Sequence, residues 1–115
     1  MIIGSSVVLA ACSPGSGLDK RQVYRDAVTK CAGSSDQIDC RYGEQERLID
    51  VGYAAICRAK GIADNSPAMR SCKRELAYAD CVRSNSDYQG YIGQMNSHVW
   101  QPSPSTLCRK YYPAV

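Results

Sequence analysis

The chain has 115 residues, of which 44% are hydrophobic and 22% charged, and its formal net charge at pH 7 is +3. This length suits one small domain rather than two, and the composition is that of a globular protein rather than a disordered one. The mild positive charge permits an anionic partner without requiring one, and we expect no nucleic-acid partner.

The first eleven residues form an uncharged, mostly apolar run that ends in Leu9-Ala10-Ala11-Cys12. A helix needs about 20 apolar residues to span a bilayer, so this run is too short to do so, but it has the length of a signal-peptide core. The four closing residues resemble the lipobox of bacterial lipoproteins. That resemblance implies cleavage before Cys12, attachment of lipid to its thiol and acylation of the new amine. Ser13 after it implies sorting to the outer membrane, with the protein facing the periplasm or the cell surface.

Three parts are therefore expected along the chain. They are a signal peptide at residues 1–11, a lipidated cysteine with a flexible tether at residues 12–17, and a helical domain at residues 18–115. The tether, SPGSG at 13–17, is small and turn-rich, as flexible linkers are. Multiple acyl chains on Cys12 would hold the protein stably at the membrane, since a single chain binds only marginally.

The first two helices are predicted over residues 18–32 and 40–60, ending at Gly33 and Gly61. Apolar residues at helical spacing predict the buried face of each helix. In the first helix this face comprises Tyr24, Ala27, Val28 and Cys31. In the second it comprises Tyr42, Ile49, Gly52, Tyr53 and Ile56. Gly52 is expected to allow a close approach by another helix.

The third helix is predicted to begin at Ser66-Pro67, where serine caps the helix and proline occupies its first position. Its apolar stripe comprises Met69, Cys72, Leu76 and Ala79. A short fourth helix is predicted over residues 87–96, and an irregular tail from Ser97 onward, where QPSPS favours an extended path. The expected fold is all-α, a small disulfide-stapled bundle of three to four helices with an irregular C-terminal tail.

Seven cysteines are present, and acylation of Cys12 leaves an even number for disulfides. An even, well-spaced set is typical of a disulfide framework in an oxidising compartment. The six are Cys31, Cys40, Cys57, Cys72, Cys81 and Cys108. Fifteen connectivities are possible, and spacing favours Cys31–Cys40, Cys57–Cys72 and Cys81–Cys108 without excluding every alternative.

One argument against Cys40–Cys81 comes from a hairpin of the second and third helices. Cys57 and Cys72 would flank its turn, whereas Cys40 and Cys81 would lie at heights differing by more than about 10 Å, too far for a disulfide. Each bridge is expected to contribute roughly 2–4 kcal/mol to the stability of so small a domain.

No residue pattern in the chain indicates catalysis, and we expect no enzyme, no metal and no cofactor. There is no CxxC pair for a metal or redox site, no GxSxG elbow and no phosphate-binding loop. His98 is the single histidine, and such a residue is more often a surface or packing residue. The acidic residues near the expected helix starts are explained by capping and by the helix dipole.

Two groups of side chains are candidates for binding. The first is basic and lies on the third helix: Arg70, Lys73 and Arg74, with Arg109 and Lys110 in the tail as possible additions. The second is aromatic and lies in the last third of the chain, led by Trp100, Tyr111 and Tyr112. Tyrosine and tryptophan provide apolar area with a polar tip, as at interfaces and sugar sites. The alternative is that the charged group is a solvated face and that the rings cap a thin core.

These features predict a small lipid-anchored lipoprotein of the bacterial cell envelope. We expect it to be a non-catalytic interaction module, of accessory, exclusion or inhibitor type, with another envelope protein as partner. The alternative is a binder of cell-wall or surface glycans through the aromatic and basic C-terminal region. An envelope hydrolase is the least favoured of the three interpretations.

Overall fold

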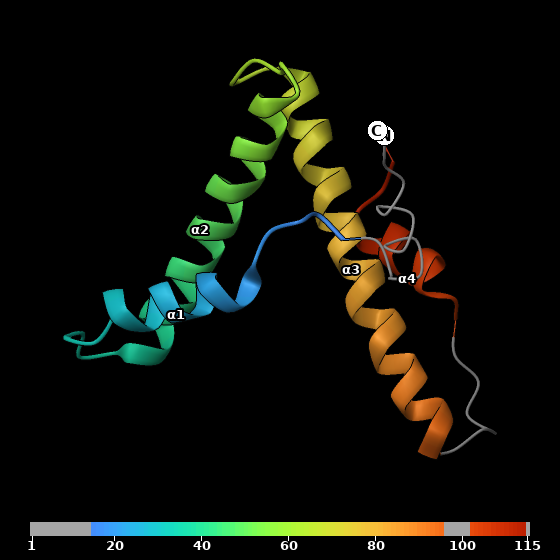
Figure 1. Ribbon diagram of the computed structural model, residues 1–115, viewed down its shortest axis with the longest axis horizontal. Helices are drawn as coiled ribbons and strands as arrows, with labels where there is room; N and C mark the ends of the chain where they lie inside the picture. Colours follow the sequence, from blue (N-terminus) through green and yellow to red (C-terminus); the bar gives the residue numbers. More distant parts are fainter. Residues whose placement is uncertain (1–14, 96–101, 115) are drawn as a thin grey trace, which may run out of the picture. The chain divides into compact units, whose positions relative to one another are not determined.

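The computed structural model describes residues 15–95 and 102–114, which are helical apart from turns and short connecting segments. Four helices follow one another: α1 (Lys20–Lys30), α2 (Gln37–Ala59), α3 (Pro67–Met95) and α4 (Pro104–Tyr111) (Figure 1). No strand occurs within these described stretches, so the prediction of an all-α, disulfide-stapled fold is confirmed. The predicted signal peptide, Cys12, His98 and Trp100 lie outside the described residues.

The described chain forms two compact units. The first unit comprises residues 17–74 and contains α1, α2 and the start of α3. The described part of the second unit comprises residues 15–16, 75–95 and 102–114 and contains the rest of α3 and α4.

α1 begins where the sequence provides a capping side chain. The Asp19 carboxylate accepts hydrogen bonds from the backbone N–H groups of Arg21 and Gln22, at 3.0 and 3.1 Å. These donors would otherwise lack a partner in the first helical turn. The helix then buries Val23 and Ala27.

The buried face of α1 differs from the predicted one. Tyr24 was expected on this face but is 50% exposed, whereas its neighbour Val23 is buried. Val23, Ala27 and Cys31 lie at i, i+4 and i+8 and form the buried stripe. Tyr24 lies beside this stripe, where a tyrosine can bury part of its ring without burying its polar hydroxyl.

α2 has clear signals at both ends. The Asp36 carboxylate accepts from the backbone N–H of Asp39 at 3.1 Å, so the helix begins slightly earlier than predicted. At the other end Gly61 has φ +87°, a conformation that glycine adopts without strain. The backbone N–H groups of Gly61 and Ile62 donate to the carbonyls of Arg58 and Cys57, which is a Schellman motif.

The buried stripe of α2 is covered along only part of its length. Tyr53 and Cys57 are buried, and α1 packs against this helix (Figure 1). Tyr42 was predicted to share the buried face but is 66% exposed. The close approach at Gly52 is made by the Leu18 side chain rather than by a helix, since a Cβ added to Gly52 would lie 2.5 Å from Leu18 Cδ1.

α3 begins as the sequence predicts and then continues without the predicted break. Ser66 Oγ accepts from the backbone N–H of Met69 at 3.1 Å, and Pro67 is the first helical residue. Residues 87–96 were predicted as a separate fourth helix, but a single helix runs through to Met95. The polar segment before Asp87 contains no proline, and Asn85 Nδ2 donates to the Cys81 carbonyl one turn earlier instead of capping a new helix.

One part of the tail that was expected to be irregular is helical. Ser103 Oγ accepts from the backbone N–H of Thr106 at 3.2 Å, and Pro104 is the first residue of α4. This arrangement repeats the serine-proline start of α3. Cys108 lies in the middle of α4 and is fully buried.

Three disulfides join the six described cysteines in the pairing that the spacing favours. Cys31–Cys40 and Cys57–Cys72 lie in the first unit, and Cys81–Cys108 lies in the second. The first closes the turn between α1 and α2, the second joins α2 to the start of α3, and the third joins α3 to α4.

Further contacts hold α4 to α3 within the second unit. The Arg109 guanidinium donates to both carboxylate oxygens of Glu75, at 2.7 and 2.8 Å. It also lies over the Tyr78 ring, 3.7 Å from the ring centroid. The Glu75 hydrogen bond raises the pKa of Arg109 above its ordinary value. Charge-assisted and stacking contacts therefore supplement the disulfide in positioning this short helix.

Candidate binding site

A hollow lies between α1 and α2 in the first unit. Its volume is about 330 Å³, at the lower end of the range for small-molecule sites. Tyr24 of α1 lines it together with Ile38, Arg41, Tyr42 and Gln45 of α2. A space of this size can take one or two side chains of a partner, or a comparably small ligand.

The apolar residues of the hollow are solvent-exposed. Ile38 and Tyr42 are each 66% exposed, and they lie one helical turn apart on the same face of α2. The stripe that is buried at Tyr53 therefore continues, uncovered, toward the start of the helix. α1 lies along this part of α2, since Cys31–Cys40 joins the end of α1 to the start of α2 and Lys20 Nζ lies 5.8 Å from the centroid of the Tyr53 ring. Ile38 and Tyr42 nevertheless stay exposed beside it.

Arg41 contributes a positive charge whose hydrogen-bonding capacity is only partly used. Its Nη2 donates to Gln37 Oε1 at 3.0 Å. Its Nε is buried and has no hydrogen-bond partner among the described residues. None of the ion pairs found in this part of the chain includes Arg41. A buried donor on a charged group is costly to leave unpaired.

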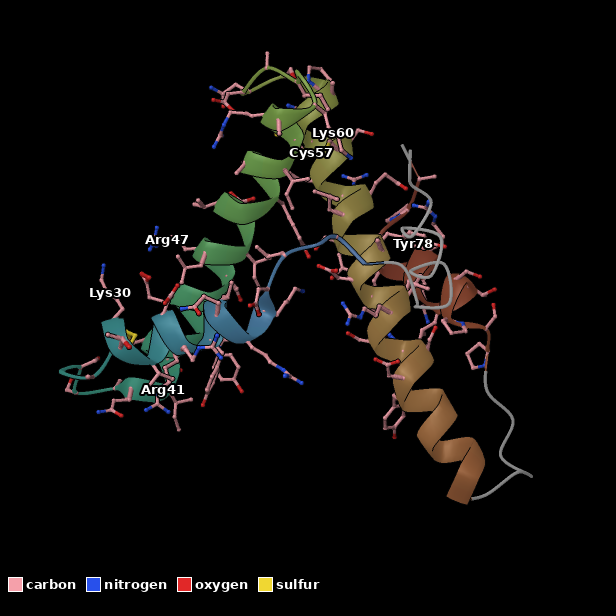
Figure 2. All side chains as sticks on the ribbon, viewed as in Figure 1. Lys30, Arg41, Arg47, Cys57, Lys60 and Tyr78 are labelled. Carbon is pink, nitrogen blue, oxygen red and sulfur yellow. A yellow bond between two sulfur atoms is a disulfide. The ribbon has the colours of Figure 1, made fainter. Side chains whose placement is uncertain are left out.

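Glu44, the acidic residue three positions after Arg41, is already paired with another arginine. The Glu44 carboxylate accepts three hydrogen bonds from Arg47, at 2.9 to 3.2 Å. These hydrogen bonds lower the pKa of Glu44 below its ordinary value. Figure 2 shows Arg41 at the start of α2, beside α1, and Arg47 farther along the helix. Arg47 thus has a carboxylate partner, and Arg41 is bound only to a neutral amide.

The basic residues predicted as a binding group lie on the part of α3 that belongs to the first unit. Arg70 and Arg74 are exposed, and Lys73 is half-buried. Lys73 Nζ donates to Asp50 of α2 at 2.9 Å, so its charge is partly neutralised. This group therefore retains two exposed cations, and its role in binding stays a prediction.

The aromatic group predicted in the last third of the chain is described only in part. Tyr111 is 65% exposed at the end of α4, and Tyr112 directly after it is half-buried. Trp100 lies outside the described residues. Arg109, which was a possible addition to the basic group, is engaged by Glu75 and Tyr78.

Sequence reasoning missed the hollow because it placed Tyr24 and Tyr42 in the core and Ile38 before the helix. The signal was nevertheless present: Ile38, Tyr42 and Gln45 continue the helical spacing of the buried stripe for two turns toward the N-terminus. What the sequence does not provide is which side chains at the start of α2 are covered by α1.

A comparison with protein-family models, curated proteins and solved structures finds no match to this chain. No helix in residues 15–95 or 102–114 is long and apolar enough to cross a membrane. No cluster of histidine, cysteine and acidic side chains suited to a metal ion occurs within the same residues.

Proposed function

We propose that this protein is a lipid-anchored interaction module of the bacterial cell envelope. Cys12, at the end of Leu9-Ala10-Ala11-Cys12, carries the lipid and holds the domain at the outer membrane. The helical domain has no catalytic role and docks on another envelope protein. Three disulfides suit an oxidising compartment such as the periplasm or the cell surface.

The observation that carries the docking role is the exposed apolar surface on α1 and α2. Tyr24, Ile38 and Tyr42 gather around one hollow and are exposed, whereas Tyr53 of α2 is buried in the core. Exposed aromatic and aliphatic side chains grouped beside an arginine are typical of protein interfaces. Binding of cell-wall glycans through the exposed Tyr111 is the second candidate.

The length of the tether limits how far the domain can stand from the membrane. Ser16 donates to the Asp80 carboxylate through both its backbone N–H and its hydroxyl, at 2.8 Å each. With Cys12 as the anchor, only the four peptide links from Cys12 to Ser16 separate the lipid from this attachment. Those links span about 14 Å when fully extended. The domain is therefore expected to act close to the membrane surface.

Cys12→Ser tests the anchor. We expect the wild-type chain to sediment with the membrane fraction and the variant to be released into the soluble envelope fraction, because the variant lacks the acylated thiol. Intact-mass analysis should find acyl chains on the wild-type protein alone and three disulfides in both proteins. Unchanged partitioning of the variant would contradict the proposed anchor.

A further inference from the structure

We propose that the hollow between α1 and α2 binds an acidic side chain of a protein partner, presented next to an apolar side chain. The partner's aspartate or glutamate carboxylate accepts a hydrogen bond from the Arg41 guanidinium. Its apolar neighbour packs on Ile38 and Tyr42. This inference rests on the proposed docking function and specifies the surface and the chemistry of the partner.

The unused donor of Arg41 determines the charge of the ligand. A guanidinium presents several N–H donors in a planar fork, and one of them here is bound by Gln37. None of the ion pairs among the described residues includes Arg41, and a carboxylate satisfies a cation better than a neutral group does. Arg47, farther along the same helix, shows this arrangement completed by Glu44.

The distribution of charge along the chain favours the same partner. Residues 17–74 contain eleven basic and eight acidic side chains, whereas the remaining residues contain three of each. The whole net charge of +3 therefore belongs to the unit that carries the hollow. Charge complementarity of this kind steers association with an acidic partner and suppresses binding of basic ones.

The lining of the hollow favours a protein over a glycan or a lipid surface. Ile38 provides a branched aliphatic wall, which suits an apolar side chain better than the flat face of a sugar ring. Attraction to an anionic membrane normally depends on a cluster of several lysines and arginines, and Arg41 is the single basic residue that lines the hollow. Tyrosine and arginine are, in contrast, the residues that most often dominate protein interfaces.

Site-specific photo-crosslinking in the intact, lipidated chain tests the inference. A benzophenone amino acid at Gln45, which lines the hollow, should crosslink to one envelope protein. Mass spectrometry should map the crosslink to a segment with an aspartate or glutamate within two residues of an apolar side chain. Arg41→Glu should lower the crosslink yield at least tenfold. Changing the mapped acid to lysine in the partner should restore the yield with Arg41→Glu.

Matched controls distinguish the effect of the Arg41 charge from an effect on folding, and binding at the hollow from binding at another surface. Arg47→Gln changes a cation on the same helix that already has a partner, and it should leave the yield within twofold. Circular dichroism and the disulfide content of each variant should equal those of the wild type. A second crosslinker position at Tyr111 reports on the exposed end of α4 in the second unit.

The outcomes distinguish the inference from the proposed function. A protein captured from the Tyr111 position and not from Gln45 would overturn the inference and leave the docking function standing. An unchanged yield with Arg41→Glu, or crosslinks from Gln45 to glycan or lipid alone, would also overturn it. Absence of protein crosslinks from both positions, with binding to isolated peptidoglycan, would overturn the docking function itself.

Discussion

The two units hold their helices together by different means. The first unit has an apolar core to which three helices contribute, with α1 providing Val23 and Ala27, α2 providing Tyr53, and α3 providing Met69. The described part of the second unit has one buried aliphatic side chain, Leu76. Its other contacts include a disulfide, an arginine–carboxylate fork, the stacking of Arg109 on Tyr78 and the bonds of Ser16 to Asp80.

This difference indicates that a covalent link is most important for a short helix with little buried apolar surface, such as α4. A helix of eight residues is far below the length at which helices are stable alone in water. α4 therefore depends on its contacts with α3, and only Cys108 of its residues is fully buried. α1 is also short, but it has a buried apolar stripe of its own. We expect the second unit to be the more sensitive to the loss of a single link.

The largest expected effect follows from removing the Cys81–Cys108 disulfide with Cys81→Ala and Cys108→Ala. This bridge closes the longest of the three loops, with a sequence separation of 27. Chain entropy predicts a loss of about 3.5 kcal/mol in the free energy of unfolding. Amide hydrogen exchange in residues 104–111 should approach the rate of an unfolded peptide. Denaturant unfolding and exchange mass spectrometry measure the two effects.

The control for this prediction is the shortest bridge, removed by Cys31→Ala and Cys40→Ala. Its sequence separation is 9, so the same relation predicts a smaller loss of about 2.5 kcal/mol. Because the bridge lies in the first unit, exchange protection of α4 should be unchanged. Equal losses for the two variants, or preserved protection of α4 without its disulfide, would contradict the difference between the units.

Local sequence signals were sufficient where a single side chain determines a helix end. Ser66-Pro67 predicted the start of α3, and Gly61 predicted the end of α2. Ser103-Pro104 carries the same signal for α4, but the neighbouring prolines favoured an extended path and the helix was missed. The favoured disulfide pairing joins cysteines close in sequence, which loop closure over short separations makes accessible.

The candidate site could not be predicted because it depends on which part of a stripe is covered. Helical spacing places Tyr42 and Tyr53 on one face of α2, and only packing makes one exposed and the other buried. The unpaired Nε of Arg41 is likewise a result of three-dimensional contacts. Tyr24 and Val23 are neighbours in the chain, and the choice between them is made by the fit of α1 against α2.

An intermediate effect on the free energy of unfolding is expected from replacing two glycines of α2 by alanine. The space beside one glycine is open, and the space beside the other is occupied by a side chain of the first unit. Gly43 has no atom within 4 Å of an added Cβ, so Gly43→Ala should stabilise the protein by about 1 kcal/mol. Gly52→Ala should gain little or nothing, because its Cβ would displace the Leu18 side chain. Urea unfolding of both variants measures the difference.

Leu18→Ala provides the test of the reason for that difference. In this background the space over Gly52 is open, so Gly52→Ala should stabilise by about the same 1 kcal/mol as Gly43→Ala. If Gly52→Ala gives the same small gain in stability in the wild type and in the Leu18→Ala background, contact with Leu18 is not what limits the stabilisation.

The smallest effect is expected from Arg109→Lys, which keeps the charge in the second unit and removes the fork. Lysine cannot donate to both Glu75 oxygens in one plane or stack on the Tyr78 ring as arginine does. We expect faster amide exchange in residues 104–111 with the disulfide intact, and an exchange rate still below that of the disulfide variant. Arg47→Lys is the matched control, because Arg47 makes a similar fork with Glu44 inside a single helix. The Arg47–Glu44 fork does not connect two helices, so Arg47→Lys should not change amide exchange beyond α2. A similar change of exchange in α4 from both variants would refute a specific role for Arg109.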